Sequence, residues 1–184
     1  MEPAPTESGA DWWRRLQALV GVVYPRVHAW DAVNEAMIRH WCEAVGDENP
    51  IHTDPAFAAA TALGTIVAPP SMLRAWLLPG YGAHRPPGSA QTDATAVRAL
   101  FAEGGFGGVI GAGAHEEYAR YLRPGERLSY SSVLESVSAL KQTRQGAGYF
   151  YTIRMDVFDQ RDEPVSLIRA SELAYRPKSG QETA

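Results

Sequence analysis

The chain has 184 residues, of which 45% are hydrophobic and 21% are charged. This is the composition of an ordinary globular protein, and the length suits one domain with a full hydrophobic core. The formal net charge of −4 argues against nucleic-acid binding, which needs a concentrated basic face. No apolar stretch approaches the length that spans a membrane. The first residues are rich in proline and acids, so we expect no signal peptide.

Cysteine occurs once, at Cys42, inside a predicted helix. A single cysteine cannot form an intrachain disulfide, so we expect a reducing, cytoplasmic compartment. We expect one folded domain, residues 11–177, between two disordered tails at residues 1–10 and 178–184.

The first part of this domain alternates helices with a single strand. Hydrophobic periodicity predicts a helix at residues 12–20, a strand at 24–30 and a second helix from Asn34 to Val45. A further short helix is expected at residues 55–62. One face of the second helix carries Met37, Ile38, Trp41 and Val45.

The segment after the second helix carries the most informative chemical pattern. It reads Gly46-Asp47-Glu48-Asn49-Pro50-Ile51-His52. Asp47 and His52 can share one water only if the chain between them bends sharply, and Pro50 supplies that bend by fixing its own φ. A carboxylate beside an imidazole is suited to proton transfer in both directions near neutral pH. The alternative is a plain turn in which His52 bonds a nearby carbonyl.

This pattern resembles the signature of the MaoC-like, (R)-specific enoyl-CoA hydratases, which are hotdog-fold proteins. The matching residues are Gly46, Asp47, Asn49, Pro50, Ile51, His52 and Ala58. The resemblance implies an α+β protein with a single hotdog fold, in which a curled antiparallel sheet surrounds a central helix. It also implies an enoyl-CoA thioester as substrate, with Asp47 and His52 as catalytic residues that hold a water, and neither a cofactor nor a metal.

Residues 66–78 would supply the central helix of this fold. An extended approach ends at Pro70, an apolar helical run follows from Ser71 to Leu78, and Pro79-Gly80 stops it after about two turns. We therefore expect a short, interrupted helix. The resemblance makes Ser71 a third catalytic position, because its backbone N–H would point from the helix N-terminus at the thioester oxygen. The alternative is that Pro69-Pro70-Ser71 only starts a helix.

The remainder is punctuated by glycine and proline from Pro79 to Gly108, with a possible helix at residues 95–102. Four strands are then predicted, and the alternation of apolar residues is clearest in the third. Their ranges are 109–122, 127–137, 149–158 and 165–176. One early strand, several helices and a run of antiparallel strands make an α+β plan.

Four segments narrow the resemblance to the MaoC-like part of the larger subunit of heteromeric steroid side-chain enoyl-CoA hydratases. They are residues 41–47, 68–76, 105–110 and 117–126. Members of this branch often continue into a further domain, so the chain is a stand-alone or a trimmed version. The branch implies a second hotdog subunit as partner, in a heterodimer or heterotetramer. A homodimer is the alternative, since isolated hotdogs leave a sheet edge exposed.

Two functions of different class follow. In the first, the chain is a working hydratase for a bulky, steroid side-chain type of enoyl-CoA. In the second, it is a non-catalytic, pocket-shaping subunit whose partner carries the working pair, and the helix cut short at Pro79-Gly80 opens space for a ring system. That stop is also compatible with an ordinary helix end whose space is filled by other side chains. A hotdog thioesterase is a weaker third choice.

Overall fold

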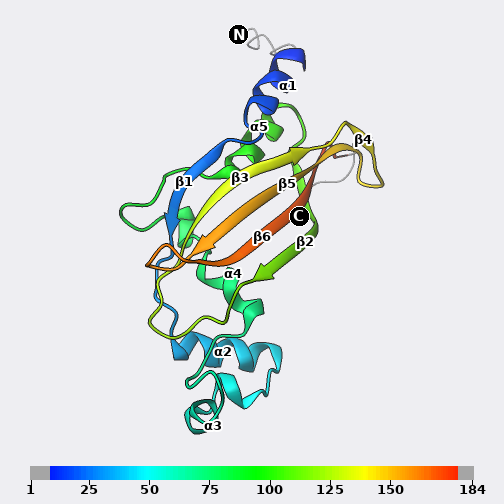
Figure 1. Cartoon of the computed structure of the whole chain (residues 1–184). Coiled ribbons are helices and arrows are strands. Elements are labelled where there is room, and N and C mark those ends of the chain that lie inside the picture. Colours follow the sequence, from blue (N-terminus) through cyan, green and yellow to red (C-terminus); the bar gives the residue numbers. More distant parts are fainter. Residues whose placement is uncertain (1–8, 178–184) are drawn as a thin grey trace.

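A computed structural model describes residues 9–177 of the chain (Figure 1). One antiparallel sheet of six strands dominates it, with the order β1-β3-β5-β6-β2, and β4 pairs with β5 at one end. The strands are β1 (Val23–His28), β2 (Gly108–Tyr118), β3 (Ser129–Val137), β4 (Lys141–Gln142), β5 (Ala147–Phe158) and β6 (Pro164–Tyr175). The four predicted C-terminal strands are thus confirmed, and β4 is an addition to them.

Five α-helices accompany the sheet in the described part of the chain. They are α1 (Gly9–Ala18), α2 (Glu35–Val45), α3 (Pro55–Ala59), α4 (Leu73–Trp76) and α5 (Val97–Glu103). Single 3₁₀ turns lie at Pro50–His52, Pro70–Met72, Tyr81–Ala83 and Ala94–Ala96. Most of the expected tails, residues 1–8 and 178–184, lies outside the described residues, and Gly9 and Ala10 already belong to α1. None of the described helices is long and apolar enough to cross a membrane.

The short helix α4 lies against one face of the sheet, with α1 and α5 near one end and α2 and α3 beyond the other (Figure 1). Met72, Leu73 and Trp76 from this region pack in one core with Val157 of β5 and Ile168 of β6. A sheet that packs its buried face on a central helix is the expected hotdog arrangement, and the α+β class is confirmed.

The central helix is shorter than the two turns predicted. Residues 70–72 form a 3₁₀ turn and α4 adds a single α-helical turn that ends at Trp76. The residue before a proline is disfavoured in the helical region, so Pro79 restricts Leu78 and the helix ends ahead of it. The interruption itself agrees with the expectation.

The buried face of α2 differs from the predicted one at its C-terminal end. Val45 is 58% exposed, whereas Ile38 and Cys42, four residues apart, are the buried positions. Cys42 lies about one helical turn after Ile38, so the two share the buried face of α2. The sequence pattern had predicted Val45 on that face.

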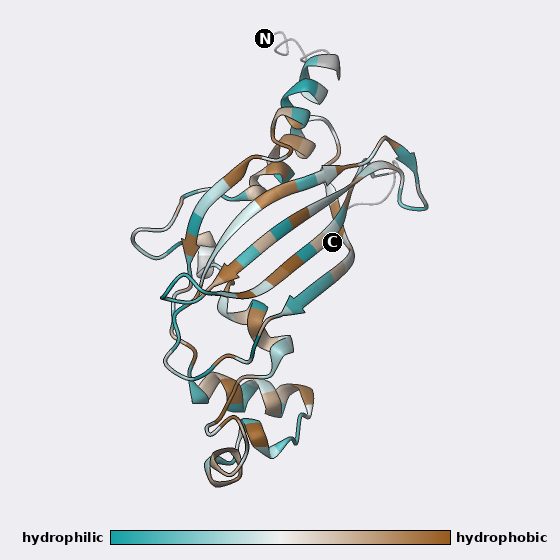
Figure 2. Cartoon of the chain, viewed as in Figure 1, coloured by the Kyte–Doolittle hydropathy of each residue, from teal (hydrophilic) through white to brown (hydrophobic). Residues whose placement is uncertain are grey.

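A second core covers the other end of the same sheet face. Trp12 and Leu16 of α1 and Phe101 of α5 pack there against Tyr151 and Ile153 of β5. Figure 2 shows hydrophobic residues on β5, β6, α2 and α4, whereas the edge strand β2 ends in hydrophilic residues. The two cores place helices on the apolar face and leave the edge strands at the surface.

A substitution at Gly104 tests how tightly this second core is packed around Trp12. The Trp12 indole N–H donates to the Leu100 carbonyl at 2.6 Å, and its ring stacks on Phe106 at 5.6 Å between centroids. A Cβ at Gly104 would overlap that ring. We expect Gly104→Ala to lower the free energy of unfolding by about 1–3 kcal/mol, measured by urea denaturation. The control Gly111→Ala meets no atom within 4 Å in β2 and should not match this loss.

Candidate active site

Helix α2 delivers Asp47 to the site. Its first turn is capped by Asn34, whose side-chain oxygen accepts the Met37 N–H at 2.9 Å. Gly46 ends the helix with φ of 71°, a left-handed conformation that glycine adopts without steric cost. The N–H of Asp47 then donates to the Cys42 carbonyl at 2.9 Å. The carboxylate therefore lies directly beyond the C-terminal end of the helix.

Asn49 braces the bend between Asp47 and His52. Its N–H donates to Oδ1 of Asp47 at 3.1 Å, and its own side-chain oxygen accepts the Ile51 N–H at 3.2 Å. Pro50 is the first residue of the 3₁₀ turn Pro50–His52, where a missing N–H costs nothing. The sharp bend expected from Asn49-Pro50 is present, and it brings the acid and the imidazole together.

His52 is held by a single strong contact. Its ring is 5% exposed, and Nδ1 lies 2.6 Å from the Val67 carbonyl oxygen. A carbonyl can only accept, so Nδ1 carries the hydrogen and Nε2 of the neutral ring has a free lone pair. Nε2 lies 3.9 Å from Oδ2 of Asp47, whose side chain is 32% exposed. The carbonyl bond of the plain-turn alternative is thus present, and it orients the ring toward the acid.

Asp47 and His52 present two acceptor atoms to the same small volume. Their separation of 3.9 Å lets one water lie about 2.8 Å from both and donate one hydrogen to each. Such a water is polarised toward hydroxide, and its two lone pairs face away from the two acceptors. This arrangement suits activation of a water nucleophile.

Ser71 lies at the start of the central helical segment. It is exposed, and it follows Val67, the residue that anchors His52, by four positions. The first N–H groups of a helix have no partner within the helix, so the Ser71 N–H is available to an oxyanion. Ser71 is connected to His52 along the chain, through residues 67–71 and the Val67 carbonyl.

The Cys42 thiol is buried in α2, five residues before Asp47, and is a poor nucleophile. Burial, and then the charge of the Asp47 carboxylate, raise the pKa of this thiol. A raised pKa keeps the sulfur protonated and a poor nucleophile. Within residues 9–177, no group of three or more His, Cys, Asp and Glu side chains gathers as metal ligands would.

A cavity of about 310 Å³ opens where α4 stops. Its walls include Leu77, Leu78, Tyr130 and Met155, and it is not lined by the Asp47–His52 pair. Its polar lining includes Arg74, Arg85 and Arg98. It also includes Asp93, which accepts the Tyr130 hydroxyl at 2.8 Å. Burial and this hydrogen bond raise the pKa of Tyr130, so the phenol stays neutral. The space beyond the short helix is therefore open and not filled by side chains.

The backbone contacts of the site cannot be predicted from the types of residues that make them. Sequence reasoning predicted Asp47, His52 and Ser71 as site residues, but it missed the Val67 carbonyl, because any residue has one. It also missed the polar wall at Asp93. Only the unusual position of a Pro-Pro pair at 69–70 indicated that this segment is held extended.

Residues 18–167 match the family described as FAS1-like, dehydratase domain region. The match covers most of the chain, and the chain belongs to this family.

Two curated relatives and one solved structure narrow the comparison. The chain is 42% identical, over 96% of its length and 56% of the relative's, to a probable enoyl-CoA hydratase alpha subunit of Thermomonospora curvata. It is 39% identical, over 83% of its length and 48% of the relative's, to the 3-oxo-4,17-pregnadiene-20-carboxyl-CoA hydratase alpha subunit of Mycobacterium tuberculosis. The chain thus spans about half the length of these curated relatives.

The solved structure is that of the ChsH1-ChsH2 complex from Mycobacterium tuberculosis. One of its chains matches with a TM-score of 0.83 and 32% identity, over 95% of this chain and 97% of that chain. The resemblance to the larger subunit of heteromeric steroid side-chain hydratases is confirmed.

Asn49 provides a test of the bend. Asn49→Ala removes the acceptor that caps the 3₁₀ turn, so we expect the free energy of unfolding to fall by about 0.5–2 kcal/mol. Asn49→Ser keeps an acceptor and should retain most of that stability. Urea denaturation of the three proteins measures the difference, and equal stability of the Ala and Ser variants would contradict the capping role.

Proposed function

We propose that this chain hydrates a 2-enoyl-CoA to a 3-hydroxyacyl-CoA, with Asp47 and His52 activating the water. The observation that carries the proposal is the bond between Nδ1 of His52 and the Val67 carbonyl. Because it leaves a free lone pair on Nε2, 3.9 Å from Oδ2 of Asp47, the two residues can act together on one water. The names of the curated relatives support the same reaction class.

The proposed reaction adds the elements of water across one double bond. The thioester carbonyl makes the β-carbon electrophilic, and the water oxygen bonds to that carbon while one of its protons passes to the pair. The π electrons move toward the carbonyl oxygen, where the Ser71 N–H stabilises the negative charge. The pair then returns a proton to the α-carbon, so protons balance and no redox cofactor enters.

A bulky acyl group is the second part of the proposal. The cavity beyond α4 offers about 310 Å³, with Leu77, Leu78 and Met155 on its apolar part and three arginines and Asp93 on its polar part. A longer central helix would place side chains in this space. The Mycobacterium tuberculosis relative is named for a steroid-derived thioester, which supports a polycyclic acyl group here.

A second hotdog subunit is the third part. Strand β2 ends the sheet, and Val109, Ile110 and Tyr118 along it are exposed. An unpaired strand edge with apolar side chains favours pairing with another sheet. The solved neighbour is a two-protein complex and the curated relatives are named alpha subunits, which supports a heteromer. We place the complex in the reducing cytoplasm, because Cys42 is a buried free thiol.

A non-catalytic, pocket-shaping subunit is the second candidate function. The observation that favours it is the cavity beyond α4, which is not lined by Asp47 or His52. Hydration by the purified chain alone, followed as loss of enoyl-thioester absorbance with a short-chain and a steroid-derived enoyl-CoA, separates the two. Turnover on either substrate supports catalysis here, whereas none from folded protein favours the pocket-shaping role.

Substitution of the pair tests its chemistry. We expect Asp47→Asn and His52→Ala each to lower kcat by about 10²–10⁴, because either change removes one of the two acceptors that activate the water. The fold should persist, as judged by circular dichroism. His40→Ala, which changes a histidine with a side chain 68% exposed, is the matched control and should keep full turnover. Unchanged turnover in either pair variant would refute the assignment.

Ser71 is expected to act through its backbone. Ser71→Ala keeps the N–H at the start of the helical segment, so kcat should match that of the unaltered protein in the same assay. A large loss on this change would show that the hydroxyl, and not the N–H, is the working group.

Leu78 tests the place of the acyl group. Its side chain is 66% exposed and lines the cavity, so Leu78→Trp would occupy part of the space. We expect kcat/KM to fall about tenfold or more for a steroid-derived enoyl-CoA and to change little for a short-chain one. Leu140→Trp, at a side chain 50% exposed ahead of β4, is the control. Equal losses on both substrates would contradict the cavity as acyl pocket.

A further inference from the structure

Residues 119–127, in the loop between β2 and β3, support the segment that holds His52. The Leu122 carbonyl in this loop accepts the Ala68 N–H at 2.9 Å. The preceding residue, Val67, supplies the carbonyl that holds Nδ1 of His52 at 2.6 Å. The position of the imidazole therefore depends on this loop through one short run of backbone.

The same loop supports the helix that carries Asp47. The Gly125 N–H donates to the Val33 carbonyl at 2.7 Å, and the Val33 N–H donates to the Glu126 carbonyl at 2.8 Å. Val33 directly precedes Asn34, the cap of α2, and α2 ends at the residue before Gly46. Residues 119–127 are thus bonded to Ala68, beside the residue that holds His52, and to Val33, at the start of the helix that leads to Asp47.

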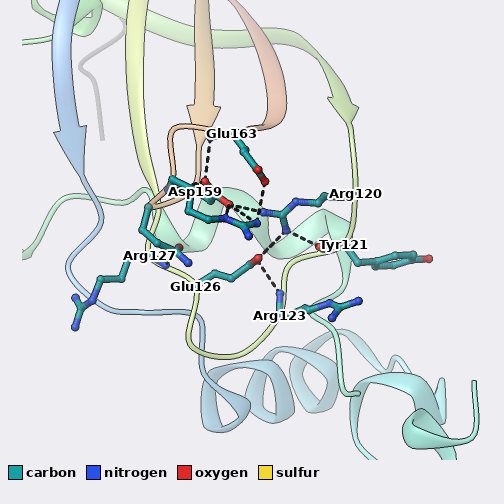
Figure 3. Close-up of polar contacts among 9 residues, drawn as sticks. Arg120, Tyr121, Arg123, Glu126, Arg127, Asp159 and Glu163 are labelled. Atoms are coloured by element: carbon teal, nitrogen blue, oxygen red, sulfur yellow. Dashed lines mark hydrogen bonds and ion pairs between the residues drawn. The ribbon is translucent and has the colours of Figure 1, made fainter. Parts of the chain in front are cut away.

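A network of charges holds the shape of this loop (Figure 3). One guanidinium nitrogen of Arg120 donates to both oxygens of Glu126, at 2.8 and 3.0 Å, and the other donates to Asp159 at 3.0 Å. Glu126 also accepts the Arg123 N–H at 2.9 Å. The Glu126 side chain thereby closes the Arg123–Glu126 turn and connects it to Arg120.

Asp159 connects the loop to the turn between β5 and β6. Its side chain is completely buried, and it accepts the N–H groups of Arg161 at 2.8 Å and Glu163 at 3.0 Å. Burial alone would raise the pKa of this carboxyl, but those hydrogen bonds and the charge of Arg161 hold it below its usual value. The carboxylate stays ionised, so Arg120 has a fixed anionic partner.

The network largely removes two carboxylates, those of Glu126 and Asp159, from water. Burying charges costs several kcal/mol per ion before pairing offsets it, and apolar side chains of similar volume often stabilise a fold as well or better. Ion networks hold geometry more narrowly, because each bond has a direction as well as a length. This favours a role in setting position over a role in stability alone.

We infer that Arg120, Glu126 and Asp159 are positioning residues for the Asp47–His52 pair. They hold residues 119–127 so that the Val67 carbonyl and helix α2, which the loop contacts at Val33, keep Nε2 and Oδ2 at their separation of 3.9 Å. None of the three belongs to the pair, and they act only through backbone. The catalytic consequence rests on the proposed function, whereas the effect on the imidazole does not.

The test is Glu126→Gln, which replaces one acceptor oxygen with an NH₂ group beside Arg120 or the Arg123 N–H. Glu172→Gln is the matched control, since the Glu172 side chain is 14% exposed against 12% for Glu126 and is also bound by an arginine, Arg98. The first readout is the ¹H–¹⁵N spectrum of the imidazole side chains in the purified chain. The His52 signals are identified by their loss in His52→Ala.

We expect His52 to be the Nδ1–H tautomer in the unaltered protein and in Glu172→Gln, and a mixture of tautomers in Glu126→Gln. In the hydration assay, Glu126→Gln should lower kcat by about ten- to a hundredfold with little change in KM, because the pair is misplaced and substrate binding is not. Arg120→Lys keeps the charge but cannot bind Glu126 and Asp159 together. It should show the same two effects, and it decides the matter if Glu126→Gln does not fold.

An unchanged His52 tautomer in folded Glu126→Gln or Arg120→Lys would overturn the inference. So would a loss of thermal stability equal to that of Glu172→Gln with no change at His52, since that is the result for a structural network. If the unaltered chain shows no turnover, the proposed function fails, but the imidazole spectra still decide the positioning role.

Discussion

The hydrogen bond between His52 and the Val67 carbonyl is the contact on which the site depends. It joins the loop after α2 to the extended segment that leads into the central helix, and it decides which imidazole nitrogen carries the hydrogen. Without this bond, the imidazole ring could rotate and either nitrogen could carry the hydrogen. The atom that faces the Asp47 carboxylate would then vary. The bond is buried, so water cannot compete with the carbonyl, and the ring keeps one orientation.

Three polar groups of the helices in this region lie in environments that are unfavourable for them. A carboxylate at the C-terminal end of α2 faces the negative end of the helix dipole, which does not favour it. The indole N–H groups of Trp41 and Trp76 are buried without a hydrogen-bond partner in the described part of the chain. Caps at Asn34, Asn49 and Asp54 offset part of these costs by satisfying backbone N–H groups beside the site. The backbone N–H groups at these caps are thus satisfied, whereas the two indole N–H groups are not.

Because the central helix is short, the hydrophobic core is divided between two sets of helices. Along β3 and β5, α4 covers the end that contains Tyr130 and Val157, whereas α5 covers the end with Leu134 and Tyr151. The cavity lies where α4 stops, with Tyr130 in its wall. The aromatic packing of α1 and α5 therefore supplies burial that a longer central helix would otherwise provide. The open space therefore lies beside α4, whereas α1 and α5 bury the other end of the sheet.

Local patterns in the sequence determined the class of fold, the strand series and the acid–histidine pair. Asn34, Gly46 and Asn49-Pro50 act on neighbours within a few residues, so their effects on helix ends and on the bend can be read in order along the chain. Val45 was misassigned because the buried face of a helix depends on what packs against it. The tertiary structure alone decided the anchor of His52, the cavity beyond α4 and the support from residues 119–127. Those features depend on backbone carbonyls and N–H groups brought together from distant segments, and such groups are the same in every residue.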